Sequence, residues 1–124
     1  MKESPIDWQE VARLVLLFRE MDLLEEEHLA PQGKIKYQFS AKGHELSQIL
    51  IAQVLNHPHD GATAYYRSRP FLLARGLKPS VALSANFALA SSPSQGRDTG
   101  VVYNLPNKDD LTVLPASPSL ITFP

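Results

Sequence analysis

The fold of this chain is decided by residues 8–21, WQEVARLVLLFREM. Apolar side chains recur there every three or four residues, the spacing that places them on one face of an α-helix. The stretch therefore predicts an amphipathic helix whose apolar face packs against its own domain, and the alternative is a face that binds a partner. The apolar positions are Trp8, Val11, Leu14, Val15, Phe18 and Met21, with Arg13, Arg19 and Glu20 off this face.

Both ends of this helix have recognisable signals. Ser4 is a good N-cap, Pro5 suits the first helical position, and Asp7 adds negative charge near the positive end of the helix dipole. Residues 25–27 are three consecutive glutamates, and negative charge is unfavourable at a helix C-terminus. We therefore expect the helix to fray or end near Glu25.

Three further helices are expected, over Glu45–Leu55, Pro70–Gly76 and Ser80 to about Ala90. Pro79 opens the last of these, and Gly76 is a natural left-handed C-cap. In the helix from Glu45, the side chains predicted to face inward are Leu46, Ile49, Leu50 and Val54.

The remaining segments are predicted to be irregular. Residues 30–43 form a loop, in which the alternation of Ile35, Tyr37 and Phe39 with polar residues allows a short extended piece. Residues 91–124 hold five of the ten prolines and have no helical period. The fold class is therefore mainly α, with a helical segment over residues 1–90 and an irregular or disordered tail over residues 91–124.

Composition excludes several classes of function. The 124 residues hold 12 basic and 13 acidic side chains, a net charge of -1, so there is no electrostatic case for nucleic-acid binding. The absence of cysteine excludes disulfides and thiolate metal sites. No run approaches the roughly 18 apolar residues of a membrane span, and the N-terminus has no signal-peptide pattern, so we expect a cytoplasmic protein.

The richest polar stretch is residues 64–70, AYYRSRP. Arg67 and Arg69 lie there beside hydroxyl groups, directly before a helix that begins with a proline. Guanidinium groups bind phosphate oxygens through two parallel hydrogen bonds, and a helix N-terminus adds N–H donors. The stretch predicts an anion or phosphate site. The alternative is that Arg67 and Arg69 pair with ordinary surface carboxylates.

Three other polar groups carry weaker signals. His44 and Glu45 could form an acid–base pair, but a glutamate in a first helical turn after Gly43 is also an ordinary capping arrangement. Residues 57–60, HPHD, resemble a metal site superficially and a turn more closely. Residues 95–98, QGRD, form a polar loop without a specific chemistry.

The order of these motifs resembles the alpha part of thiamine-diphosphate-dependent 2-oxo acid dehydrogenase first components. The branched-chain 2-oxoisovalerate type is most similar, including bacterial forms with fused alpha and beta parts. The resemblance extends from about Trp8 to Leu114. It is carried by residues 43–45 (GHE), 59–61 (HDG), 65–70 (YYRSRP), 73–77 (LARGL) and 94–98 (SQGRD).

This resemblance implies a role for the chain inside a larger enzyme. In the family a Tyr-Arg pair contacts the diphosphate of thiamine diphosphate, which here implies Tyr66 and Arg67 as cofactor-binding residues. The complete enzymes use thiamine diphosphate and magnesium to decarboxylate a 2-oxo acid, and pass the acyl group to lipoyl-lysine on a partner acyltransferase. The implied partners are therefore a beta part and a lipoylated acyltransferase, within an α/β thiamine-diphosphate-binding fold.

The sequence also departs from the family pattern. The family's Gly-Asp-Gly magnesium motif does not occur, and Asp98-Thr99 follows Gly96-Arg97 where many relatives have methionine and histidine. We therefore assign no catalytic residue and no metal ligand, and expect a truncated part that is inactive alone and binds no cofactor by itself. The alternative is a non-catalytic helical interaction or regulatory module. In a fragment, helix faces such as Trp8 to Met21 would be exposed and could self-associate.

Overall fold

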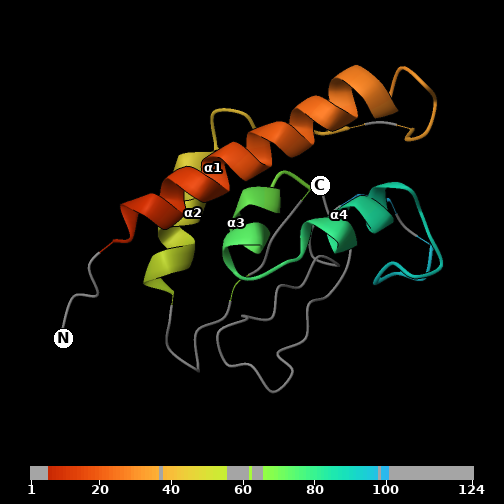
Figure 1. Ribbon diagram of the computed structural model, residues 1–124. Coiled ribbons are helices and arrows are strands. Elements are labelled where there is room, and N and C mark those ends of the chain that lie inside the picture. The colour runs from red at the N-terminus through yellow and green to blue at the C-terminus, as the bar shows by residue number, and fades with distance from the viewer. Residues whose placement is uncertain (1–5, 37, 56–61, 63–65, 98, 101–124) are drawn as a thin grey trace.

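The computed structural model describes residues 6–36, 38–55, 62, 66–97 and 99–100. In this part of the chain the fold is mainly helical and contains no strand, as the sequence predicts. The elements are α1 (Trp8–Leu23), the π-helical segment η1 (Leu24–Leu29), α2 (Glu45–Val54), α3 (Arg69–Ala74) and α4 (Pro79–Asn86). Figure 1 shows α1 lying along one side of the molecule, with α2, α3 and α4 beneath it.

The first helix begins later than the sequence predicts. Its N-cap is Asp7, whose carboxylate accepts a hydrogen bond from the backbone N–H of Glu10 at 3.0 Å. An aspartate both caps the free N–H groups and places negative charge at the positive end of the dipole, so it is a suitable cap. Ser4 and Pro5, the predicted cap and first residue, lie outside the described residues.

The α-helix ends near Glu25, as the sequence predicts, but the chain does not leave its helical path there. The α-helical hydrogen bonding ends at Leu23, but the chain continues as η1 through Leu29. Glu25 has no exposed surface and pairs with Arg69 of α3 at 2.8 Å. This tertiary ion pair offsets the unfavourable position of a carboxylate near a helix C-terminus, and local charge alone did not reveal it.

The apolar face of α1 forms one side of the core. Four of its six predicted positions are buried, Val15 is partly buried, and Trp8 is 63% exposed. Packing of this face within the chain is therefore confirmed, and the expectation that it would lie open in a fragment is wrong except at Trp8. The buried core residues are Val11, Leu14, Phe18, Met21, Ala41, Ile49, Ala52, Phe71, Leu72, Leu73, Leu77, Ala82 and Ala85.

The inward face of α2 was predicted only in part. Ile49 is buried and Leu50 packs partly against the core, but Leu46 is 50% exposed and Val54 is 67% exposed. The buried face instead carries Glu45, Ile49 and Ala52, which are spaced by four and three residues. This face lies against α3 and α1, because the small Ala52 and the ion-paired Glu45 permit a close approach.

Left-handed residues end the last two helices. Gly76, at φ +94°, ends α3 as predicted, and the N–H of Leu77 donates to the carbonyl of Leu72 in the typical C-terminal motif. The helix α4 ends at Asn86, four residues before the predicted end, because Ala88 adopts φ +52° and makes the same type of cap.

The other predicted irregular regions are described only in part. Residues 91–97 form a series of turns, and no strand occurs among the described residues of the 30–43 loop. Residues 101–124 lie outside the described part, so the irregular tail remains a prediction there. Among the described helices, none is long and apolar enough to cross a membrane.

Candidate functional site

Arg67 lies in the turn that leads into α3, beside a pair of aromatic rings that contact each other. Its guanidinium carbon lies 5.2 Å from the ring centre of Tyr66 and 5.9 Å from that of Phe39. The two rings are 4.7 Å apart, centre to centre. A guanidinium near aromatic faces is attracted by the ring quadrupoles. The sequence predicts Tyr66 and Arg67 as neighbours in a site, and the fold adds Phe39 from a loop 28 residues earlier.

The charge of Arg67 has no carboxylate partner among the described residues. One of its terminal nitrogens, Nη1, donates to the backbone carbonyl of Ser40. A guanidinium carries five N–H groups, so most of its donor capacity is not used by this bond. Arg67 is only half-buried, and Tyr66 is 41% exposed. The arrangement is therefore chemically suited to bind an anion.

Arg69, two residues away, has a different environment. It is 6% exposed, and its Nη1 lies 2.8 Å from Glu25 Oε2 and 3.6 Å from Asp22 Oδ1. Arg69 therefore pairs with carboxylates, which are buried and not at the surface, whereas Arg67 has no such pair among the described residues. The two arginines do not form one phosphate site, because Arg69 is ion-paired with buried carboxylates.

A buried polar cluster surrounds Arg69. Ser40 donates its hydroxyl to Asp22, and the side-chain amide of Asn86 donates to Glu25. Burial raises the pKa of Asp22, and this effect exceeds the opposing hydrogen bond from Ser40 and the attraction of Arg69. Sequence reasoning missed this cluster, although Asp22 and Glu25 lie four and seven residues after Phe18 and so continue its buried face.

His44 and Glu45 do not form a catalytic pair. His44 is exposed, whereas Glu45 is buried and accepts hydrogen bonds from the guanidinium of Arg19. Burial raises the pKa of Glu45, but the backbone N–H groups of Glu45 and Gly43, together with Arg19, lower it below its usual value. The place of Glu45 in the first turn of α2 and its ion pair with Arg19 favour the structural interpretation of this motif.

The two remaining polar motifs, residues 57–60 and 95–98, form no binding site among the described residues. His57, His59 and Asp60 lie outside the described residues, and within the described part no three potential ligands form a metal site. Arg97 is exposed on a turn. Its neighbour Gly96 has φ +77°, and a Cβ there would lie 2.7 Å from the Ala88 carbonyl oxygen, so glycine is required for packing.

Two side chains link α2 and α3, because each one bonds free backbone groups at an end of the other helix. Gln48 of α2 accepts a hydrogen bond from the Phe71 N–H at 3.2 Å, near the start of α3. Arg75, at the end of α3, donates to the carbonyls of Ala52 and Leu55 at 3.0 and 2.6 Å, at the end of α2. The 73–77 motif therefore has a structural role, because Arg75 satisfies carbonyl groups that a helix end leaves free.

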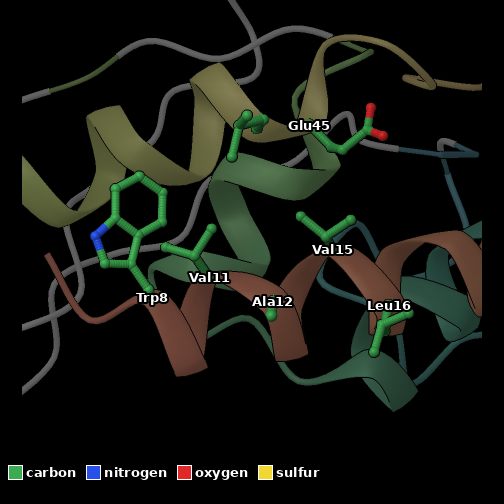
Figure 2. Close-up of a pocket in the computed structure, with 7 residues that line it drawn as sticks. Trp8, Val11, Ala12, Val15, Leu16 and Glu45 are labelled. Atoms are coloured by element: carbon green, nitrogen blue, oxygen red, sulfur yellow. The ribbon is translucent and has the colours of Figure 1, made fainter.

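A second feature is an apolar hollow of about 530 Å³ between α1 and the start of α2. Figure 2 shows Trp8, Val11 and Val15 rising from α1 towards α2, with the carboxylate of Glu45 directed away from them. Trp8 is 63% exposed and Leu16 is 65% exposed. The lining residues are Trp8, Val11, Ala12, Val15, Leu16, Glu45 and Leu46.

The sequence matches no protein-family model and no curated protein. The resemblance to the dehydrogenase alpha part therefore depends on the motifs of the sequence itself. Of those motifs, the structure describes residues 43–45 and 73–77 in full, and 65–70 and 94–98 only over residues 66–70 and 94–97.

Proposed function

We propose that this chain is part of the alpha region of a thiamine-diphosphate-dependent 2-oxo acid dehydrogenase of the branched-chain type. In this proposal Tyr66 and Arg67 contact the diphosphate of the cofactor. The observation that supports it is the position of Arg67: a half-buried guanidinium without a carboxylate partner among the described residues, next to the paired rings of Tyr66 and Phe39. The order of motifs along the sequence supplies the identity of the anion.

The residues present suit a diphosphate but not the metal that accompanies it. Guanidinium and phenol groups donate hydrogen bonds to phosphate oxygens. No Gly-Asp-Gly motif occurs in the 124 residues, and no metal-ligand group is found in the described part. We therefore propose that other parts of the enzyme hold the magnesium ion, and that this chain by itself is inactive.

The role of Arg67 is then electrostatic. Thiamine diphosphate supplies the electron sink for decarboxylation of a 2-oxo acid, and the protein binds and orients it. The rings of Phe39 and Tyr66 lie beside the guanidinium, within the range of a cation–π attraction. In the complete enzyme, a beta part would complete the site and a lipoylated acyltransferase would accept the acyl group.

The proposal is tested by titrating the chain with thiamine diphosphate and magnesium, followed by NMR. The chain alone is not expected to retain the cofactor, because a single contact without a metal site gives little affinity in water and salt. At high ligand concentration we still expect weak, saturable shifts centred on Tyr66 and Arg67. Arg67→Ala should abolish these shifts. Arg97→Ala removes an exposed arginine elsewhere and should leave them unchanged. The absence of saturable shifts at Arg67, or equal shifts in the Arg67→Ala protein, would contradict the proposal.

A second candidate, a non-catalytic helical interaction module, is favoured by the hollow beside Trp8. Trp8 and Leu16 lie one turn before and one turn after Ala12 on the same face of α1. This large–small–large order is self-complementary in an antiparallel pair of α1 helices, with Ala12 at the two-fold axis. We therefore propose a second copy of this chain as the occupant of the hollow.

The two-copy arrangement is tested by analytical ultracentrifugation across the micromolar to millimolar range. We expect a reversible dimer that Trp8→Ala converts to a monomer, with Leu89→Ala, an exposed leucine on a distant turn, as the matched control. Trp8 is the only tryptophan, so its fluorescence should shift to the blue as the dimer forms. A chain that stays monomeric throughout would exclude this candidate and leave the diphosphate proposal unaffected.

A further inference from the structure

Gln48 lies on α2 and contacts the backbone of Arg67 and the backbone of Phe71, near the start of α3. Its side-chain nitrogen Nε2 donates to the carbonyl of Arg67 at 3.0 Å. Its oxygen Oε1 accepts from the N–H of Phe71 at 3.2 Å. One partner can only accept and the other can only donate, so the amide group has a single orientation that satisfies both.

The start of α3 depends on this side chain. Ser68, the N-cap residue, makes no side-chain capping bond, and Pro70 has no N–H group. Phe71 is the third helical residue, where an N-cap side chain would normally accept the N–H. Gln48 supplies that acceptor from a different helix, so the beginning of α3 is fixed by a contact 23 residues distant in sequence.

Hydrogen bonds hold both the backbone and the side chain of Arg67. Gln48 fixes its carbonyl, and the carbonyl of Ser40 accepts from its guanidinium. Ser40 is itself anchored, because its hydroxyl donates to the buried Asp22 of α1. The backbone of Arg67 is thus held by a contact to α2, and its guanidinium by a contact to the loop before α2.

We infer that Gln48 is a positioning residue for anion recognition by Arg67, although Gln48 does not touch the anion. This inference rests on the proposed function, because it assumes that Arg67 is the group that binds a diphosphate. A guanidinium held in one orientation loses less conformational freedom on binding than a mobile one, so binding is tighter. Removal of the Gln48 contacts therefore weakens diphosphate binding without removing any contacting group.

The test uses the 124-residue chain, inorganic pyrophosphate as the probe, and the variant Gln48→Met. Methionine keeps the length and most of the volume of glutamine but removes both hydrogen bonds. We expect hydrogen exchange of the Phe71 amide to accelerate by about two- to tenfold, the range for loss of the one ordinary hydrogen bond that this amide makes to Gln48. Pyrophosphate affinity should fall by a similar factor. The Arg67 Nε–Hε signal should also exchange faster with water.

Gln53→Met is the matched control. Gln53 lies on the same helix and donates to the Asp7 carbonyl at 3.4 Å, away from the Arg67 turn. It should change neither the Arg67 signal nor pyrophosphate affinity. If Gln48→Met does not fold, Gln48→Leu serves as a shorter apolar replacement with the same expected result.

The outcomes separate this inference from the proposed function. Unchanged Arg67 exchange and unchanged affinity in a folded Gln48 variant would overturn the positioning role while leaving the diphosphate site intact. If Arg67 exchanges faster in the Gln48 variant but the wild-type chain binds no pyrophosphate, the proposed function is overturned. The role of Gln48 in anion recognition is then overturned as well. A lower melting temperature with an unchanged Arg67 signal would show a purely structural role and contradict the inference.

Discussion

At the scale of single residues, burial assigns different roles to two arginines that the sequence presents as a pair. Arg69 is buried against Asp22 and Glu25, whereas Arg67 is half-buried and has no carboxylate partner among the described residues. A buried ion pair is costly to break, because the remaining charge stays in a low-dielectric environment. The same residue type therefore stabilises the core at one position and is suited to binding at the other.

This difference predicts unequal costs of removing the two side chains. Arg69→Ala should lower the free energy of unfolding by about 3–5 kcal/mol, because it leaves two buried carboxylates without their cation. Arg67→Ala should lower it by less than about 1 kcal/mol, as for most partly exposed positions. Urea denaturation of both variants measures these values. Equal losses would show that the buried cluster does not carry the stability assigned to it.

Asp22 predicts a pH dependence of stability. Its pKa is raised in the folded state, mainly by burial, above the ordinary value of about 3.9 that applies when the chain is unfolded. Between these two values the folded state binds more protons, so this contribution to stability is complete at low pH and is lost as the pH rises through the folded pKa.

The measurement is the free energy of unfolding against pH for the wild-type chain and for Asp22→Asn. We expect the difference between the two proteins to vary with pH above about 4, with the wild type losing stability relative to the variant as the pH increases. Glu45, whose pKa is lowered, acts in the opposite direction and is present in both proteins. A difference that is constant with pH would contradict the raised pKa.

At the scale of helices, local rules located the elements and the buried face of α1, but the buried face of α2 only in part. Proline and glycine signals placed α3 and α4 within a few residues, and Gly76 ends α3 as predicted. The π-helical η1 and the exposure of Leu46 could not be predicted, since both result from contacts between distant segments. For the same reason the sequence indicated Arg67 as a site residue but gave no sign of Phe39 or Gln48.

Ala88 provides a test at this scale. It ends α4 in the left-handed region, at φ +52°, where an alanine Cβ is strained and glycine is not. Ala88→Gly should therefore raise the free energy of unfolding by about 1 kcal/mol. Ala90→Gly, two residues further along, is the control, and it should be neutral or slightly destabilising. A loss of stability in the Ala88 variant would exclude strain at this cap.

At the scale of the whole molecule, the described residues form one helical core with two distinctive surface features. The core covers most of the apolar face of α1. The surface features are the Arg67 turn with its two rings, and the hollow beside Trp8. The first supports a diphosphate contact within a larger enzyme and the second supports pairing of two copies. Because they use different residues, variants of one leave the other unchanged.

The central claim is that Arg67 recognises the diphosphate group of thiamine diphosphate. The most direct measurement follows the Arg67 Nε–Hε signal by NMR while thiamine diphosphate with magnesium, or thiamine alone, is added to the same chain. The account predicts a saturable shift with thiamine diphosphate and none with thiamine, which lacks the anion. Equal shifts with both ligands, or no shift with either, would contradict the account.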